Sequence, residues 1–446
     1  MKKLKFQSPS GMHDILPEDQ PYFQRVAEVT ANLVEFYGFK RIDPTVLENV
    51  EVFTRGIGEV TDIVEKEMYV LKTRGGDALA MRPEFTAGIA RSYIEHGMCA
   101  LPHPVKLYTT GPIFRAERPQ AGRYRQFNQW DLEVFGEDSP AIDAQVIQVC
   151  WNILRELGLR DIIVEVNSIG DSQCRPYYKK LLMNYLRSRQ NNMCADCRAR
   201  LKKNPLRVLD CKEERCRKVV SNAPKIVDHL CEPCNNHFKE VLEFLDELEL
   251  PYRLNHCLVR GLDYYTRTVF EIFSEGVPVK KDKEKKKEGS ANEACPIETP
   301  GQIALVGGGR FDNLIKMLGG KDTPACGAAS GIERLVNLMK TQGVRPTKPL
   351  LPQVFLAQIG ILAKRKSLRL FEEFRKSRIR VVESLGRDSL KAQLGRAQKA
   401  EVRYALILGQ QEALDGTVII RDMGVGRQET VKLERAVEEM KKRLKK

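Results

Sequence analysis

Apolar residues recur at intervals of three and four after Pro21, at positions 23, 26, 29, 33 and 36. This spacing predicts one amphipathic helix that ends at Gly38. The same pattern predicts a second helix from Ala144 to Leu157, and the β-branched run at 162–166 predicts a strand after it. Between the two helices, residues 105–136 predict a strand, a polar loop and a second strand.

The second of these strands alternates polar and apolar side chains. Because successive side chains of a strand point to opposite faces, Gln129, Asp131 and Glu133 share one face and the apolar residues between them share the other. A strand that lies half in solvent shows the same alternation. The pattern therefore leaves a solvent-facing strand and a polar binding site as alternatives.

A Cys- and Arg-rich stretch begins near residue 171, and an amphipathic helix follows it near residue 238. We interpret residues 171–249 as a small inserted domain, which divides a larger domain into residues 1–170 and 250–345. The Lys-rich run at 279–290 predicts a disordered surface loop in the second part of that larger domain.

Three prolines, at positions 346, 349 and 352, predict a linker over residues 346–353. Beyond it, residues 354–446 alternate strand-like and helical patterns, which predicts a compact α/β domain. The strands are expected at 354–357, 380–382, 404–408 and 417–421, and the helices at 365–376, 388–399 and 430–443.

The 446 residues include 73 Lys and Arg against 59 Asp and Glu, a formal charge of +14. No run approaches the roughly 18 apolar residues of a membrane span, and the first residues lack the apolar stretch of a secretion signal, so we expect a cytoplasmic protein. Residues 354–446 hold 22 Lys and Arg against 12 Asp and Glu. This basic end either binds a polyanion such as nucleic acid or is a solvated surface with a Lys-rich tail.

Six of the twelve cysteines lie between residues 194 and 234. Reduced thiols of a cytoplasmic protein, some of them metal-bound, fit this pattern better than disulfides do. The two outer C-x-x-C pairs have the spacing of zinc ligands, which predicts one zinc site formed by Cys194, Cys197, Cys231 and Cys234. Structural cysteines without metal are the alternative. Further candidates for a second site are Cys211, Cys216, His229 and His237.

Arginines surround the turn at residues 119–122, at positions 115, 118, 123 and 125. A planar guanidinium suits bidentate capture of phosphate. Beside an acidic strand face, these arginines indicate a nucleotide and an amine-bearing ligand, as aminoacyl adenylation requires. Farther along the chain, small residues at 327–331 precede a helical run that carries Arg334.

Three segments in this order, 38–44, 114–133 and 327–335, resemble motifs one, two and three of the class II aminoacyl-tRNA synthetases. Segments 258–266 and 307–312 resemble the two histidine motifs of the histidyl-tRNA synthetase family. The resemblance covers essentially the whole chain. It implies an α/β protein with three parts. The α+β catalytic domain would hold an antiparallel class II synthetase sheet flanked by helices. The other two parts would be the inserted domain and a C-terminal α/β anticodon-binding domain.

The resemblance also implies roles for individual residues. The catalytic cations would be Arg260, near the α-phosphate, together with Arg115 and Arg334. ATP would contact Arg115, Glu117 and Arg334. The residues that bind histidine would be Glu84, Thr86, Gln129, Glu133, Tyr264 and Tyr265. Candidates for contacting the acceptor end of the tRNA, near its extra 5′ guanosine, are Arg118, Gln120 and Arg123.

The implied reaction is ATP-dependent activation of L-histidine to histidyl-adenylate, followed by transfer to the 3′ end of tRNA(His). ATP and Mg²⁺ would be required, and a homodimer is expected. Three alternatives are a synthetase-like regulatory subunit that binds histidine without aminoacylation, a synthetase for another amino acid, and a plain tRNA-binding protein. Three points depart from the family pattern: Phe311 stands where tyrosine is usual, the segment 56–59 after motif one carries no check of its own, and the loop at 279–290 is longer than the family usually has.

Overall fold

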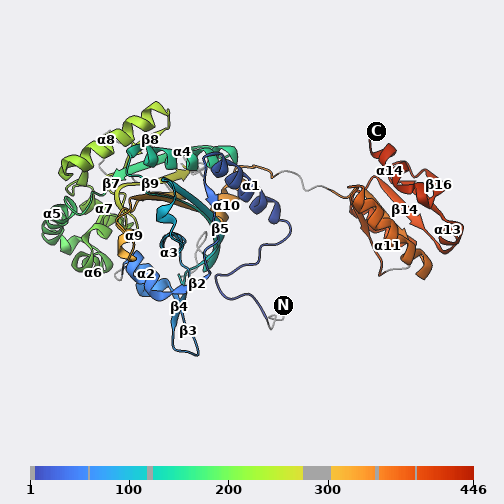
Figure 1. The fold of residues 1–446 in the computed structure, drawn as a ribbon, viewed down its shortest axis with the longest axis horizontal. Coiled ribbons are helices and arrows are strands. Elements are labelled where there is room, and N and C mark those ends of the chain that lie inside the picture. Colours follow the sequence, from blue (N-terminus) through green and yellow to red (C-terminus); the bar gives the residue numbers. More distant parts are fainter. Residues whose placement is uncertain are drawn as a thin grey trace. The chain divides into compact units, whose positions relative to one another are not determined.

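The structure is a computed structural model that describes residues 6–58, 61–117, 124–274, 303–346, 351–386 and 389–445. It divides into two compact units, Met1–Pro346 and Thr347–Lys446. Figure 1 shows the elements of each unit. The Lys-rich loop at 279–290 and part of the expected linker, residues 347–350, lie outside the described residues.

An eight-stranded sheet forms the centre of the larger unit (Figure 1). Its outer pairs, β1 with β5 and β7 with β8, are parallel, and all other neighbours are antiparallel. The mostly antiparallel sheet flanked by helices that the sequence predicted is therefore confirmed. The strands in spatial order are β1 (Lys40–Arg41), β5 (Val105–Phe114), β6 (Gln126–Phe135), β11 (Ala325–Gly331), β10 (Ile303–Arg310), β9 (Thr266–Ser274), β7 (Ile162–Ser168) and β8 (Tyr252–Leu254).

Four helices cover the apolar face of this sheet. The side chains of Trp130, Leu132 and Val134 are buried beneath them, together with apolar residues of β7 and β9. This burial explains the alternation in β6, because one face lies against helices while the other lines a cavity. The four helices are α1 (Gln20–Phe36), α4 (Pro140–Glu156), α8 (Glu232–Glu247) and α10 (Ile332–Thr341).

A second apolar core joins the opposite side of the sheet to the Cys-rich segment. It contains Phe53, Phe85 and Phe311 as well as Tyr178 and Leu182 of that segment. The elements around it are α2 (Val50–Ile57), α3 (Thr86–Glu95), α9 (Leu314–Met317) and a small sheet of β2 (Leu47–Asn49), β4 (Ala78–Met81) and β3 (Tyr69–Lys72). The Cys-rich segment adds α5 (Arg175–Arg187), α6 (Ala195–Lys203) and α7 (Glu214–Val220).

Short turns complete the larger unit and the smaller one. They are the π-helical turn η1 (Ile63–Glu67) and the 3₁₀ turns η2 (Met98–Ala100), η3 (Gln190–Asn192), η4 (Pro205–Val208), η5 (Ile226–His229) and η6 (Leu433–Arg435).

The smaller unit is an α/β domain, as expected from the sequence. Its sheet has apolar cores on both faces because alternate residues of β12 face opposite ways, Val354 and Leu356 toward one and Phe355 and Ala357 toward the other. The strands in order are β13 (Val381–Glu383), β12 (Val354–Gln358), β14 (Tyr404–Leu408), β15 (Thr417–Asp422) and β16 (Gln428–Lys432). The helices are α11 (Ile361–Lys376), α12 (Leu390–Lys399), α13 (Gln410–Asp415) and α14 (Ala436–Leu444).

The prediction of one closing helix over 430–443 was wrong at its start. Residues 428–432 form the edge strand β16, paired with β15, and α14 begins only at Ala436. The β-branched pair Thr430 and Val431 favours a strand, and Val431 packs against the core of this unit.

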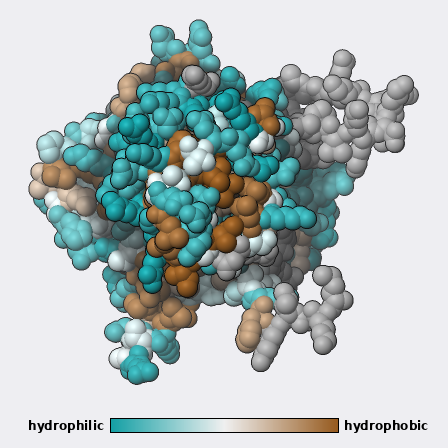
Figure 2. Space-filling view, turned by 90° about the vertical axis from the view of Figure 1, so that its right-hand side faces the viewer, coloured by the Kyte–Doolittle hydropathy of each residue, from teal (hydrophilic) through white to brown (hydrophobic). Residues whose placement is uncertain are grey.

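Figure 2 shows one face, on which hydrophilic residues predominate and hydrophobic residues gather near the middle. None of the described helices has the length and apolar composition that crossing a membrane needs.

A buried ionic cluster ties the sheet to its helices. The side chain of Arg310 is fully buried; its Nε donates to Asp143 Oδ1 at 3.0 Å, and another guanidinium nitrogen lies 3.1 Å from Asp312 Oδ1. His237 Nε2 lies 2.5 Å from Asp143 Oδ2. Burial opposes ionisation of Asp143, but the charge of Arg310 and the contact with His237 lower its pKa.

We predict that Arg310→Met destabilises the larger unit by about 3–5 kcal/mol, because Asp143 would keep a buried charge without its main partner. Urea unfolding followed by tryptophan fluorescence measures this unit alone, since both tryptophans, Trp130 and Trp151, lie in it. The matched control is Lys316→Met, whose partner is Asp322 in an exposed ion pair; its effect should stay within about 1 kcal/mol. Equal effects of the two variants would contradict a structural role for the cluster.

Candidate active site

One cavity of about 190 Å³ opens on the polar face of the large sheet. All the described residues for which the sequence predicted a role in binding histidine or ATP line it: Glu84, Thr86, Arg115, Glu117, Gln129, Glu133, Arg260, Tyr264, Tyr265 and Arg334. The tRNA candidates Arg118, Gln120 and Arg123 lie outside the described residues.

Two glycines make room for charged side chains on this face. Gly327 pairs with Glu133 across β11 and β6, and a Cβ atom at Gly327 would overlap the Glu133 carboxylate. A Cβ atom at Gly307 of β10 would overlap the guanidinium of Arg260. The sheet therefore accepts these side chains flat against its backbone only because both positions are glycine.

Three carboxyl groups form the acidic floor of the cavity. Glu84, Asp131 and Glu133 are 4%, 1% and 1% exposed. One Glu84 oxygen accepts from the backbone N–H of Ala87 at 2.9 Å, at the start of α3. One oxygen on each of the three residues, Glu84 Oε2, Asp131 Oδ1 and Glu133 Oε2, is buried with no hydrogen-bond partner among the described residues.

Burial raises the pKa of all three carboxyl groups, that of Asp131 to about 8. The negative charge of Glu84 raises the pKa of Asp131 and Glu133 further. A ligand that brings positive charge and N–H donors would satisfy the unpartnered oxygens and favour the ionised forms. The acidic floor therefore suits an ammonium group and a second nitrogen donor.

Aromatic rings stand beside the acidic floor. The ring centroids of Tyr264 and Tyr265 are 4.7 Å apart, and Phe311 lies 5.6 Å and 6.5 Å from them. Burial raises the pKa of Tyr265 to about 12 and that of Tyr264 well above its usual range, so both phenols keep their protons at neutral pH. Phe311 contributes a ring to this wall but no hydroxyl.

The guanidinium of Arg260 is a positive charge that lines the same cavity. It pairs with Glu271 of β9, and its guanidinium lies 5.7 Å from the centroid of the Tyr265 ring. Burial opposes its charge, but Glu271 and Tyr265 raise its pKa, so Arg260 stays protonated. Its Nε is buried without a hydrogen-bond partner among the described residues.

Two further arginines are fixed at the cavity wall by backbone carbonyls. Arg115 Nε donates to Pro83 O at 2.9 Å, and Arg334, in the first turn of α10, donates to Ala304 O at 3.0 Å. Next to Arg334, both carboxylate oxygens of Glu333 accept from the backbone N–H of Asn128 at 2.9 Å. The cavity thus joins an acidic floor to three arginines, the charge distribution that an amine and a polyphosphate require.

Comparison with known proteins agrees with this arrangement. A family model described as "Histidyl-tRNA synthetase" matches residues 11–280, and one described as "Anticodon binding domain" matches residues 353–443. The chain belongs to the histidyl-tRNA synthetase family. It is 44% identical to a histidine–tRNA ligase of Dehalococcoides mccartyi over 98% of this chain and 100% of that protein.

Solved structures extend the comparison to the fold. The apo histidyl-tRNA synthetase of Staphylococcus aureus superposes with a TM-score of 0.76 and 30% identity, covering 98% of this chain and 100% of that one. A Bacillus halodurans protein titled as an ATP phosphoribosyltransferase regulatory subunit/histidyl-tRNA synthetase shares only the fold, at 19% identity and a TM-score of 0.61, with coverage of 92% and 99%.

Several cavity residues of this family member had no predicted role. Glu271, which pairs with Arg260, and Glu333 were missed because each is a single carboxylate in an otherwise ordinary strand or helix pattern. The alternation of β6 places Asp131 on the polar face of its strand, but neither the pattern nor the resemblance implies a role for it. For Glu271, the sequence does contain a signal, because this carboxylate interrupts the apolar residues of β9.

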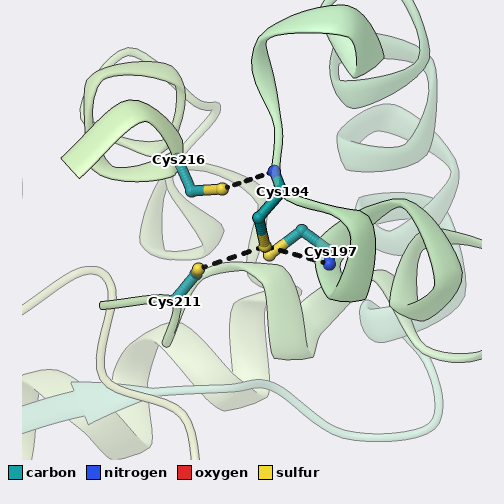
Figure 3. A group of neighbouring side chains, drawn as sticks. All are labelled: Cys194, Cys197, Cys211 and Cys216. Carbon is teal, nitrogen blue, oxygen red and sulfur yellow. Dashed lines mark hydrogen bonds between the residues drawn. The ribbon is translucent and has the colours of Figure 1, made fainter. Parts of the chain in front are cut away.

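The predicted zinc quartet was wrong in its grouping. The thiols of Cys194 and Cys197 lie with those of Cys211 and Cys216 (Figure 3), whereas Cys231 and Cys234 lie elsewhere, with Asp171 and Cys174. Helices α6 and α7 bring the first set together, and residues of the loop after β7 approach the start of α8 to form the second. Chain spacing alone could not distinguish these pairings.

Among the described residues, neither His229 nor His237 belongs to one of the two thiol clusters. His237 contacts Asp143 in the buried ionic cluster, and the ring of His229 stacks at 6.3 Å on Tyr178. Both are packed side chains of the larger unit.

The raised pKa of Asp131 predicts a pH dependence of stability. A pKa near 8 in the folded protein and about 3.9 in the unfolded chain means that the folded state binds more protons between these values. The protonated Asp131 therefore contributes stability to the folded state. This stability is fully present below about pH 4 and is lost as the pH rises through 8. We predict that the ligand-free protein loses less thermal stability between pH 5.5 and 8 after Asp131→Asn.

Thermal unfolding at pH 5.5, 7 and 8, followed by tryptophan fluorescence, measures this effect. The matched control is Asp322→Asn, which removes an exposed carboxylate. Between pH 5.5 and 8, this variant should lose as much thermal stability as the wild type. An unchanged slope in Asp131→Asn would show that this carboxyl group does not titrate in the expected range.

Proposed function

We propose that this cavity joins L-histidine to the α-phosphate of ATP and then transfers the histidyl group to a hydroxyl at the 3′ end of tRNA(His), with AMP as the leaving group. The observation that carries the proposal is the meeting of an acidic floor and three arginines in one cavity of a histidyl-tRNA synthetase family member. We also propose that the protein acts in the cytoplasm, where tRNA is charged.

The acidic floor binds the amino acid in this proposal. Glu84 and Thr86 at the start of α3 hold the α-ammonium group, and Gln129 assists from β6. Glu133 accepts the N–H of the imidazole ring, while the phenol of Tyr265 donates to the other ring nitrogen and Tyr264 lines the pocket beside it. A buried acceptor without a partner is costly, so an amino acid that lacks this N–H binds less well.

The arginines act on the nucleotide. A carboxylate oxygen of histidine attacks the α-phosphorus, the bond to the oxygen that bridges to the β-phosphorus breaks, and pyrophosphate leaves with that electron pair. The carboxylate is already ionised, so no general base is needed. Arg260 and Arg115 stabilise the charge that develops at the α-phosphate, and Arg334 holds the outer phosphates.

Carboxylates at the arginine end fit the Mg²⁺ that normally accompanies ATP. Glu117 and Glu333 both line this part of the cavity, and Mg²⁺ prefers one or two carboxylates together with phosphate oxygens. When bound, the ion neutralises phosphate charge.

The smaller unit supplies the surface for the tRNA. Its segment 353–443 matches the anticodon-binding model, and its excess of basic residues suits a phosphate backbone. Arg118, Gln120 and Arg123 remain the candidates for contacting the acceptor end. A homodimer is supported by exposed apolar side chains on and beside the three-stranded sheet, namely Val46, Leu47, Val70 and Leu71.

Pyrophosphate exchange into ATP, run with each of the twenty amino acids, tests the first step. Histidine alone should support exchange, and charging of tRNA(His) should follow. Exchange with another amino acid or with none would overturn the proposal.

We predict that Arg260→His lowers the rate constant of adenylate formation by at least about 10²-fold, because one donor aimed at developing charge is worth about 3 kcal/mol. The dissociation constant for histidine should change little. The matched control is Arg55→His, at an exposed position on α2, which should leave the rate unchanged. A normal rate with weakened histidine binding would assign Arg260 to substrate binding instead.

We predict that removing residues 347–446 keeps histidine-dependent exchange measurable and greatly reduces charging of tRNA. The larger unit has its own cores and contains the whole cavity, whereas the anticodon-binding match lies in the smaller unit. Tryptophan fluorescence first establishes that the shortened chain is folded. Full charging activity by the folded shortened chain would rule out a tRNA-binding role for the smaller unit.

A further inference from the structure

Four thiols in the Cys-rich segment converge on one point (Figure 3). Cys194 precedes α6, Cys197 lies in its first turn, Cys211 follows η4 and Cys216 belongs to α7. All four sulfur atoms lie within 4.8 Å of one another. Three of these cysteines are buried and Cys211 is half-buried.

The spacing of the sulfur atoms is that of ligands around a common ion. Cys194 Sγ and Cys211 Sγ are 3.9 Å apart, far longer than the roughly 2.05 Å of a disulfide. A tetrahedral zinc ion with bonds of about 2.3 Å would set its sulfur ligands about 3.8 Å apart.

Backbone N–H groups already point at two of these sulfurs. The N–H of Cys197 donates to Cys194 Sγ at 3.3 Å, and the N–H of Cys194 donates to Cys216 Sγ at 3.1 Å. Such bonds stabilise thiolates, which are the form that binds metal. Cys150 and Cys326, by contrast, are buried singly and belong to neither group.

A second group lies where the Cys-rich segment joins the catalytic fold. Asp171 and Cys174 follow β7, and Cys231 and Cys234 begin α8. Cys174 Sγ and Cys231 Sγ lie 3.6 Å and 3.9 Å from the same oxygen, Asp171 Oδ1. Two residues separate Asp171 from Cys174, and two separate Cys231 from Cys234. Cys194 and Cys197 have the same spacing, which is common for zinc ligands.

We propose that the protein binds two structural zinc ions, one held by Cys194, Cys197, Cys211 and Cys216 and the other by Asp171, Cys174, Cys231 and Cys234. The first ion fixes three short segments of the insertion. The second fastens the point at which the chain enters the insertion to the point at which it leaves. Both sites have four protein ligands, so they are closed to substrate.

The second site also supports the histidine pocket. Arg175, next to Cys174, donates to Gly170 O at 2.8 Å and to Tyr265 O at 2.6 Å. The N–H of Arg267 donates to Gly170 O at 2.8 Å. The second zinc ion therefore stabilises the backbone that carries Tyr265. This consequence rests on the proposed function, whereas the count of zinc ions does not.

Native mass spectrometry and elemental analysis of the full chain, purified without chelator, test the proposal. Two zinc ions per chain are expected, one after Cys216→Ser, one after Cys231→Ser and none in the double variant. The exposed Cys99→Ser is the matched control and should keep both ions. Cys231→Ser should raise KM for histidine in exchange more than Cys216→Ser does, with kcat less affected.

Replacement by Co²⁺ in the unmodified protein gives a readout that does not depend on the variants. Two tetrahedral thiolate sites are expected, with the larger loss of thiolate charge-transfer absorbance after Cys216→Ser, because four thiolates surround that ion and three surround the other. A single ion lost in both variants would indicate one shared site and overturn the proposal. Metal-free protein with freely titrating thiols, or a coloured iron–sulfur cluster, would also overturn it.

Discussion

The burial of three carboxyl groups on one face of the central sheet is the constraint on which the site depends. Glu84, Asp131 and Glu133 are almost fully enclosed, and each has an oxygen with no hydrogen-bond partner among the described residues. Burial raises the pKa of all three groups, and the charge of Glu84 raises the pKa of Asp131 and Glu133 further, so these groups cost stability until a cation arrives. The protein thus gives up some stability to hold a pocket already shaped for an ammonium group and a ring nitrogen.

The rest of the larger unit maintains that arrangement. Helices on the opposite face bury the alternate residues of β6 and keep the strand in register. Glycines at 307 and 327 let Arg260 and Glu133 lie against the backbone. Arg260, paired with Glu271, lines the same cavity as the three carboxyl groups, so the cavity holds both kinds of charge.

Local patterns in the sequence predicted the alternating face of β6, the arginine-rich turn and the α/β nature of the C-terminal unit. The resemblance to a family supplied the residues that share the cavity. Pairings between distant segments could not be predicted in this way. The register of β9 and β10 places Glu271 opposite Gly307, against which Arg260 packs, and the two thiol clusters are sorted by helix packing. Strand β16 was missed because its few apolar residues also fit a helix.

The most direct test of the charged floor is the number of protons exchanged when histidine binds. Calorimetry at pH 7.5, in two buffers with different ionisation enthalpies, measures that number. Ligand-free carboxyl groups with raised pKa values are partly protonated at this pH, and the α-ammonium group favours their ionised forms. We therefore expect a net release of protons, smaller in Asp131→Asn. No release, or an uptake of protons, would contradict the account.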